Sequence, residues 1–277
     1  MPLSPDQVIA LARSAEAADG VAPLDEATLL TLEHHPDRAS IWGDTRGFGL
    51  LIGDELTLLV APHERGSGLG RRLLRERELP GDPEGTRLSA WSHGDHPAAS
   101  ALAASEGWSR ARELWVMRTT VGDLAIPAAP AGVELRGFRP QESRDASELL
   151  RVNAAAFAQH PEQGAMDAEN LADRMAEDWF DPDGLVMAWA GEHLLGFHWT
   201  KRHSHAEGEV YVVGIDPGAQ GRGLGRLLTT AGLAYLHSRG ADSVHLFVEA
   251  DNAAAVRLYR GLGFTHDPHD THVQYRR

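Results

Sequence analysis

Three alternating glycines in the second half of the chain have the spacing of an anion-binding loop. Gly221, Gly223 and Gly225 follow an apolar segment that ends at Pro217, and apolar residues at helical spacing come after them. A glycine loop between a strand and a helix turns several backbone N–H groups toward the helix N-terminus, where a phosphate group can bind. The spacing therefore predicts a loop that binds a phosphate or pyrophosphate group.

Two common phosphate-binding motifs do not fit this loop. A P-loop needs Gly-Lys followed by Ser or Thr, but Gly225 is followed by Arg226 and Leu227. A dinucleotide fingerprint needs the spacing G-x-G-x-x-G, and its third glycine position falls on Arg226 or on Leu228. The pattern that remains is Q/R-x-x-G-x-G/A, which begins here at Gln220.

The first half of the chain repeats this loop. Pro62 and the glycines at 66, 68 and 70 align without a gap with Pro217 and the glycines at 221, 223 and 225. Farther along, residues 105–108 (Ser-Glu-Gly-Trp) align with residues 261–264 (Gly-Leu-Gly-Phe). Two matches in the same order indicate a duplication. A single glycine-rich loop is often only a tight turn, so the second copy strengthens the prediction of a binding loop.

A second motif follows the loop in the C-terminal half. Asn252, Ala255, Tyr259, Gly263 and Phe264 have the pattern N-x-x-A-x-x-x-Y-x-x-x-G-F. An ordinary helix with a core tyrosine and a glycine at its C-terminal end has the same pattern. The motif therefore predicts a helix, and its position after the loop favours a second contact with the same ligand.

The elements that position these motifs form a mixed sheet flanked by helices, an α/β fold. In the second half, apolar alternation predicts strands at 133–139, 185–190, 194–200, 209–215, 244–248 and 271–275. Helical periodicity predicts helices at 142–157, 167–180 and 252–261, and another directly after the glycines. The stretch between Thr28 and Gly53 is short and has no clear pattern.

The segment from Asp123 to Gly132 contains two prolines and small residues, which is typical of a linker. The sequence therefore predicts two domains, at residues 1–126 and 127–277. At 277 residues, the chain is long enough for two domains of ordinary size.

The composition bounds the function. The chain has no cysteine, which excludes disulfides, thiolate metal sites and a cysteine nucleophile. A formal net charge of -14 argues against nucleic acid and anionic membranes as partners. Without a long apolar run or an export signal, the sequence favours a cytoplasmic protein, and we expect a monomer.

The loop and the second motif together resemble the GCN5-related N-acetyltransferase (GNAT) superfamily, which binds the pyrophosphate of acetyl-CoA. The resemblance implies two tandem GNAT domains. Across nearly the whole chain, the sequence looks like the mycothiol synthase family. The segments that carry this resemblance are 17–23, 151–153, Phe157, 160–164, 179–184, 196–201 and 208–214.

The resemblance to mycothiol synthases implies a reaction and a substrate. That family transfers an acetyl group from acetyl-CoA to the cysteinyl amine of desacetylmycothiol, a cysteine amide of a glucosamine–inositol pseudodisaccharide. No metal is expected. Two alternatives remain from the residues alone: a tandem acetyltransferase for another amine, such as an antibiotic or a protein N-terminus, and a non-enzymatic CoA-binding protein.

The same resemblance assigns catalytic roles to two residues. Glu209 is expected to be the general base that deprotonates the amine, and Tyr259 the general acid that protonates the CoA thiolate. The alternatives are a solvent-facing strand residue for Glu209 and core packing for Tyr259.

Binding roles follow from the resemblance as well. In the second half, CoA is expected to contact Val213, Gly214, Ile215, Gln220, Gly221, Arg222, Gly223, Leu224, Gly225, Arg226, Asn252, Ala253, Ala254, Ala255, Val256 and Arg257. The corresponding positions in the first half are Leu58, Leu59, Val60, Gly66, Ser67, Gly68, Leu69, Gly70 and Arg71. The acceptor is expected to contact Glu26, Glu162, Lys201, Glu209 and Phe247.

The first half lacks the predicted catalytic pair. Ala103 aligns with Tyr259, His96 aligns with Asn252, and Asp54 falls opposite Glu209. We therefore expect a binding or structural role for this half and no turnover. Histidines at 93/96, 203/205 and 266/269/272 have ligand-like spacing, but without cysteines or an HExxH motif they are interpreted as solvated loop residues.

Overall fold

The computed structural model describes residues 3–76, 88–159 and 163–277. The chain divides into two compact units. We call Met1–Trp115 with Glu249–Asp251 and Asp267–Arg277 the N-terminal unit, and Val116–Val248 with Asn252–His266 the C-terminal unit. The predicted α/β fold with a mixed sheet is confirmed in both units, since each has antiparallel and parallel strand pairs.

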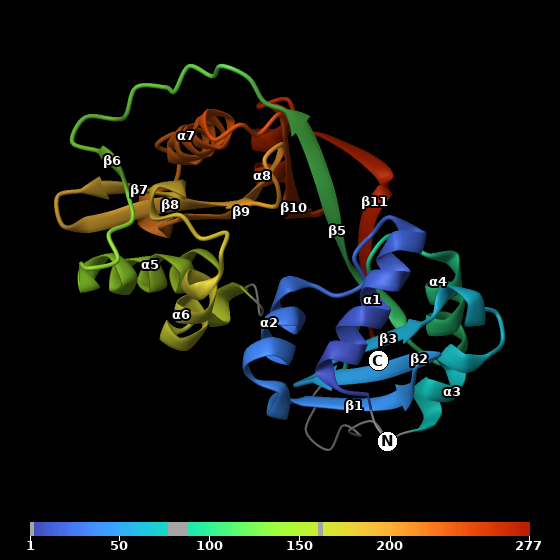
Figure 1. Cartoon of the computed structure of the whole chain (residues 1–277). Helices are drawn as coiled ribbons and strands as arrows, with labels where there is room; N and C mark the ends of the chain where they lie inside the picture. Colours follow the sequence, from blue (N-terminus) through green and yellow to red (C-terminus); the bar gives the residue numbers. More distant parts are fainter. Residues whose placement is uncertain (1–2, 77–87, 160–162) are drawn as a thin grey trace. The chain divides into compact units, whose positions relative to one another are not determined.

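The N-terminal unit is a sheet with helices on both faces (Figure 1). Its helices are α1 (Pro5–Asp19), α2 (Glu26–His34), α3 (Leu69–Glu76) and α4 (Pro97–Ser105), and its strands are β1 (Ala39–Asp44), β2 (Gly47–Ile52), β3 (Glu55–Val60) and β4 (Ser89–Ser92). Adjacent residues of β2 face opposite sides, as a pleated strand requires. Leu50 therefore packs with α1 and α2, while Leu51 packs with α3.

The C-terminal unit contains the strand order β10-β9-β8-β7-β6. Its strands are β6 (Glu134–Gly137), β7 (Leu185–Ala190), β8 (His193–Arg202), β9 (Glu207–Ile215) and β10 (Ser243–Glu249). The strands from β6 to β9 are antiparallel, and β9 pairs with β10 in parallel.

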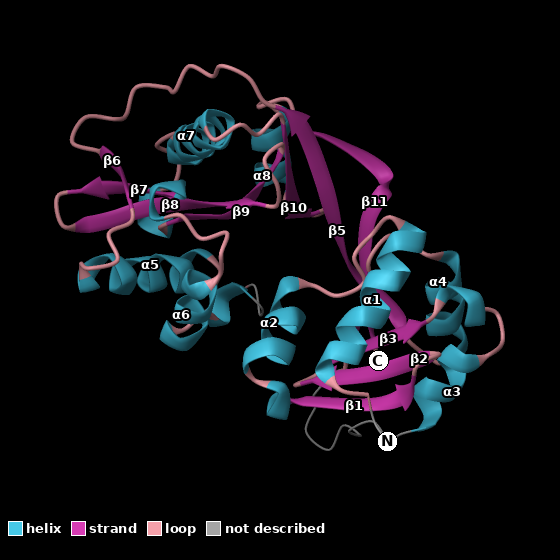
Figure 2. Cartoon of the chain, viewed as in Figure 1, coloured by secondary structure: helices cyan, strands magenta, loops and turns pink. Residues whose placement is uncertain are grey.

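Four helices accompany this sheet: α5 (Ser143–Ala156), α6 (Ala168–Ala176), α7 (Leu224–Ser238) and α8 (Ala253–Arg260). Figure 2 shows α5 and α6 on one face of the sheet and α7 on the other. The alternation of strand β7 explains the two layers. Met187 packs in the cluster under α5, and its neighbour Ala188 packs against α7.

The duplication is visible in the structure of the two halves. Strands β3 and β9 each lead through a short 3-10 turn, beginning at Pro62 and Pro217, into a loop with two left-handed glycines. The helix after each loop begins at the aligned leucine, Leu69 in α3 and Leu224 in α7. The halves also end alike, because β5 (Ser109–Thr120) and β11 (Thr265–Arg276) are both strands of 12 residues.

The compact units do not follow the predicted halves 1–126 and 127–277. The last strand of each half contributes residues to both units: 116–120 of β5 belong to the C-terminal unit, and 267–276 of β11 belong to the N-terminal unit. The end of β11 pairs with β4 antiparallel, with Val273 opposite Ser92 and Arg276 opposite Ser89. Strand pairing far from the linker therefore decides where each unit ends. The predicted domains 1–126 and 127–277 describe the duplicated halves of the sequence, and they stay a prediction.

Several element boundaries differ from the sequence prediction. The stretch between Thr28 and Gly53 contains most of α2 and both β1 and β2. Helix α6 ends at Ala176 instead of 180, because Glu177 adopts an extended backbone with ψ 144°. Strand β11 begins six residues before the predicted 271 and reaches Arg276. The linker prediction is consistent with the absence of helix and strand between Thr120 and Glu134.

Candidate active site

The described pairing of strand β9 with β10 covers only the first part of β9. Its parallel register with β10 runs from Glu207↔Ser243 to Val210↔Leu246, and β9 then continues to Ile215. On its other side, the register with β8 shifts between Trp199 and Thr200, which leaves Tyr211 as an extra residue. Val213, Gly214 and Ile215, the segment predicted to offer N–H groups to acetyl-CoA, therefore lie beyond the described β10 register.

The predicted pyrophosphate loop has the geometry that its glycines suggest. Gly221 and Gly223 both have φ +76°, which L side chains rarely adopt, and no atom lies within 4 Å of the position that a Cβ would take. Gly223 is the N-cap of α7, and no side chain caps this helix. The first N–H groups of a 15-residue helix thus border an open loop, which fits a pyrophosphate.

An arginine brace holds the turn in front of this loop. Asp216 Oδ1 accepts a hydrogen bond from Gly218 N at 2.8 Å, and Arg151 Nη1 donates to Asp216 Oδ2 at 2.6 Å. Arg151 Nη2 also donates to Leu194 O at 2.9 Å. Hydrogen bonds from Arg151 and Gly218 lower the pKa of Asp216, so the pair stays charged. Residues 151 and 216 are distant in the chain, so the sequence alone does not indicate this ion pair.

Glu209 lies near the start of β9 and is buried, with 8% of its side chain exposed. Its Oε2 is 2.7 Å from His203 Nε2 in a hydrogen bond, and 3.8 Å from His245 Nε2. Lys201 of β8 is its direct partner in the sheet register. The alternative of a solvent-facing strand residue is therefore wrong.

Two histidines lie beside Glu209. His203 lies in an exposed turn, as expected of a solvated loop residue, and its ring also hydrogen-bonds the buried carboxylate. His245, which has no ligand-like spacing in the sequence, is buried, and this burial is the main cause that lowers its pKa. Position 245 faces 209 only through the parallel register of β9 and β10, so the sequence alone has no signal for it.

An aromatic group surrounds Lys201. Its ammonium lies 4.7 Å from the ring centre of Trp179 and 5.5 Å from that of Tyr211. Arg174 Nη1 donates to Tyr211 Oη at 2.6 Å. Such cation–π contacts hold a lysine over an aromatic surface. Trp179 falls within the helix predicted at 167–180, but it lies past the end of α6 and packs against Tyr211.

The predicted acceptor residues are brought together in part. Lys201 and Glu209 are neighbours in the sheet, and Phe247, 41% exposed, contacts the His245 ring edge-on at 5.7 Å between centroids. Glu26 is the first residue of α2 in the N-terminal unit. Glu162 lies outside the described residues.

Tyr259 is buried on α8 and packs edge-on against Phe264 at 5.8 Å between ring centroids. Burial raises its pKa to about 12, so the phenol is protonated at neutral pH. At the start of the same helix, Asn252 Oδ1 accepts from Ala255 N at 3.1 Å and acts as the N-cap. The core packing that was the alternative for Tyr259 is present, and the role of its hydroxyl stays a prediction.

The first half keeps the loop but not these groups. Gly66 and Gly68 have φ +77° and +82°, and space is open at both Cβ positions. Ala103 is buried where Tyr259 lies in the second copy, and His96 makes no capping hydrogen bond. Asp54 is exposed in a turn before β3. These three positions provide no counterpart of the Glu209 and Tyr259 pair.

Two other histidines depart from the prediction of solvated loop residues. His93 Nδ1 lies 2.8 Å from Ala22 O, and its ring stacks on His272 at 4.8 Å between centroids. Burial lowers the pKa of His93. Both therefore pack inside the N-terminal unit.

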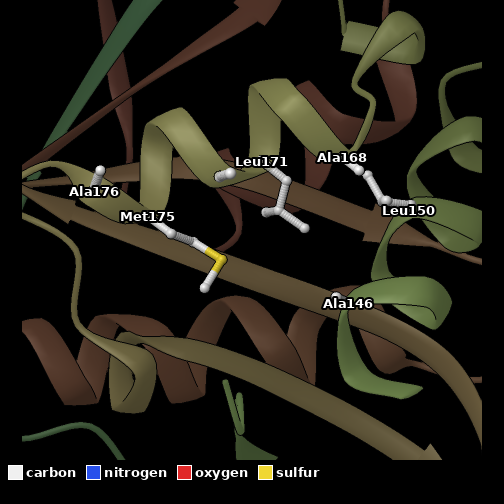
Figure 3. Close-up of a pocket in the computed structure, with 7 residues that line it drawn as sticks. Ala146, Leu150, Ala168, Leu171, Met175 and Ala176 are labelled. Carbon is white, nitrogen blue, oxygen red and sulfur yellow. The ribbon is translucent and has the colours of Figure 1, made fainter. Parts of the chain in front are cut away.

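The C-terminal unit also has an apolar hollow of about 430 Å³ between α5 and α6. Figure 3 shows Leu171 and Met175 projecting from α6, with Ala146 and Leu150 on α5. No predicted catalytic or binding residue lines this hollow. Its lining carries no polar group for acid–base chemistry, so the site is assigned to the β9 and α8 residues.

The fold and the site define a class of protein, the GNAT acetyltransferases. A sequence model described as the Acetyltransferase (GNAT) family matches residues 150–264. Among solved structures, the tandem GNAT protein from the clavulanic acid biosynthesis pathway superposes with a TM-score of 0.71, covering 100% of this chain and 97% of that one at 20% identity. This likeness shows the fold.

Curated relatives show the family. This chain is 59% identical to the mycothiol acetyltransferase of Nocardioides sp., covering 98% of this chain and 96% of that protein. It is 48% identical to the mycothiol acetyltransferase of Thermobispora bispora, covering 100% and 97%. The chain belongs to the mycothiol acetyltransferase family and is an acetyl-CoA-dependent N-acetyltransferase. Within the described residues, none of the helices has the length and apolar character needed to cross a membrane.

Proposed function

We propose that this enzyme transfers the acetyl group of acetyl-CoA to the cysteinyl amine of desacetylmycothiol, and that the C-terminal half performs the reaction. The names of its relatives support the substrate. The observation that carries the site assignment is Glu209, a buried carboxylate next to Lys201 in the sheet register and hydrogen-bonded to His203.

Glu209 acts first on the acceptor. Its carboxylate takes a proton from the cysteinyl ammonium, which frees the nitrogen lone pair to form the new N–C bond. Lys201, held over Trp179, offers a positive charge and hydrogen-bond donors to the polar acceptor. Glu26, Glu162 and Phe247 remain proposed acceptor contacts.

The backbone and helix α7 hold acetyl-CoA. N–H groups of β9 at 213–215 stabilise the thioester oxygen as negative charge develops on it. The first N–H groups of α7, together with Arg222 and Arg226, bind the pyrophosphate. Acetyl-CoA supplies the acetyl group and the thiol that leaves as the C–S bond breaks.

Tyr259 acts on the departing sulfur. A free thiol has a pKa of about 8.5, whereas burial raises the pKa of Tyr259 to about 12. Full transfer of the phenolic proton to the thiolate is therefore uphill. The phenol instead donates a charge-assisted hydrogen bond to the sulfur, and the thiolate can take its proton from solvent after release.

An acceptor comparison tests the substrate. The release of CoA thiol from acetyl-CoA is measured with cysteinyl-glucosaminyl-inositol, with free cysteine amide and with a peptide that has a free N-terminus. The proposal expects kcat/KM to be at least about 100-fold higher for the pseudodisaccharide, since lost polar contacts in a binding site cost several kcal/mol. Equal or better turnover of another amine by the folded enzyme would contradict it.

A further inference from the structure

Glu209 and His203 differ sharply in their exposure to solvent. Glu209 has 8% of its side chain exposed, whereas His203, bonded to it at 2.7 Å, has 35% exposed. His203 lies in the turn between β8 and β9. One imidazole thus joins the buried carboxylate to the surface of the C-terminal unit.

The reaction requires a path by which a proton can leave the buried site for solvent. On becoming an amide, the acceptor ammonium loses two protons: one compensates for the proton gained by the thiol, and the other must reach solvent. If Glu209 takes a proton from the ammonium, the carboxylic acid formed is buried and has to lose that proton before the next turnover. An imidazole is suited to this step, because it can accept a proton on one nitrogen and release one from the other.

We propose that His203 carries this proton from Glu209 to solvent, an inference that rests on the proposed role of Glu209. With its proton on Nδ1, neutral His203 accepts the Glu209 carboxyl proton on Nε2, so the O–H bond breaks as the N–H bond forms. The imidazolium then releases its Nδ1 proton to water. His203 now donates from Nε2 to the restored carboxylate, and exchange with water returns the ring proton to Nδ1.

Other titratable and charged groups also lie near Glu209. His245 on β10 is buried, and its Nδ1 lies 3.1 Å from Glu207 Oε1 at an angle that makes no hydrogen bond. Glu207 itself is 3.7 Å from Arg118 of β5. Lys201 faces Glu209 from β8. His203 both hydrogen-bonds Glu209 and reaches solvent, so it is assigned the transfer, and His245 the positioning of the carboxylate.

Chemical rescue separates proton transfer from a structural role. His203→Ala is expected to lower kcat by about 10-fold or more, in the lower range of lost acid–base groups. Added imidazole should restore kcat in proportion to its concentration, with substituted imidazoles following their basicity. His205→Ala in the same turn is the matched control, with kcat unchanged and no response to imidazole.

A second variant, His203→Gln, controls for the possibility that His203→Ala does not fold. His203→Gln keeps a side-chain amide that can donate to Glu209 but cannot exchange protons, so it should fold, keep its KM values and remain slow. Wild-type kcat in His203→Gln, or a slow His203→Ala that imidazole does not restore, would overturn the relay. Glu209→Gln measured in parallel separates the two claims: an active Glu209→Gln contradicts the proposed function, whereas an inactive one beside a fully active His203→Ala contradicts the relay alone.

Discussion

The buried carboxylate of Glu209 costs free energy that its neighbours must offset. An ionised group removed from water is stable in a protein only with hydrogen bonds or opposite charge nearby. His203 provides the hydrogen bond at 2.7 Å, and Lys201 lies opposite in the register. A carboxylate that is buried despite the free-energy cost of desolvation is a candidate for acid–base chemistry.

A substitution of Tyr259 tests its proposed role in the reaction. Tyr259→Phe keeps the ring against Phe264 but removes the hydroxyl that is proposed to stabilise the thiolate. A lost charge-assisted hydrogen bond of about 1.5–3 kcal/mol predicts a kcat lower by about 10- to 100-fold. Steady-state kinetics at saturating acetyl-CoA measures it, and an unchanged kcat would remove Tyr259 from the reaction.

The pH dependence of that role follows from the pKa of Tyr259. The phenol loses its proton only as the pH rises through about 12. We therefore expect the kcat of the wild type and of Tyr259→Phe to depend on pH in the same way below about pH 10. A difference in the pH profiles would mean that Tyr259 ionises much earlier and is a proton donor of ordinary acidity.

Because His198 is buried, we expect the free energy of unfolding to fall as the pH falls. This residue is fully buried in β8, and burial lowers its pKa to about 4, against 6.5 in an unfolded chain. Between these values the unfolded chain binds a proton that the folded protein does not, so stability falls as the pH falls. From pH 7.5 to pH 5 the loss is about 2 kcal/mol from this residue. Urea unfolding of the wild type and His198→Leu measures it, and equal slopes against pH would contradict it.

The type and spacing of the loop glycines predicted the binding loop, whereas the roles expected of Glu209 and Tyr259 came from the resemblance to a known family. His203, His245 and the Arg151–Asp216 brace could not be predicted in the same way. Their partners are set by the β9–β10 register, by a turn and by a contact between distant segments. Such pairs have no fixed spacing along the chain.

At the scale of elements, the strand–loop–helix unit occurs twice with the same backbone. Apolar segments and helical periodicity predicted the elements of the second half, where β7 packs one face against α5 and α6 and the other against α7. They failed for β1 and β2. Residues 47–51 of β2 are all buried, so its alternation is lost, and in β1 only Trp42 is buried.

The two loops allow a matched comparison. Gly223→Ala places a Cβ at φ +76° directly before α7, and Gly68→Ala makes the same strained change at φ +82° before α3. We expect Gly223→Ala to raise the KM for acetyl-CoA by about 10-fold or more, since a strained residue costs about 1–3 kcal/mol and shifts the N–H groups. Gly68→Ala should leave kcat and KM within about two-fold. An equal rise in both variants would show that strain alone causes it.

At the scale of the whole molecule, the two halves share their last strands between the compact units. Residues 267–277 join the N-terminal unit through the pairing of β11 with β4. The sequence predicted the linker and the duplication but not this exchange. Strands β5 and β11 are alike in length and position within their halves, so local patterns give no reason to place either one in the other unit.

The retained loop in the first half does not imply a second centre of turnover. Ala103 and the exposed Asp54 leave that half without the acid–base groups of the second. We therefore expect turnover to depend wholly on the C-terminal site, while the first loop serves in binding or structure.

One substitution tests this account most directly. Turnover of acetyl-CoA with cysteinyl-glucosaminyl-inositol is measured for wild type and Glu209→Gln, with acetyl-CoA binding measured separately for each. The account predicts a fall in kcat of about 100-fold or more, the range for loss of a general base, with acetyl-CoA affinity unchanged. Turnover within about three-fold of wild type would contradict it, because another group, or the other half of the chain, would then be taking the proton.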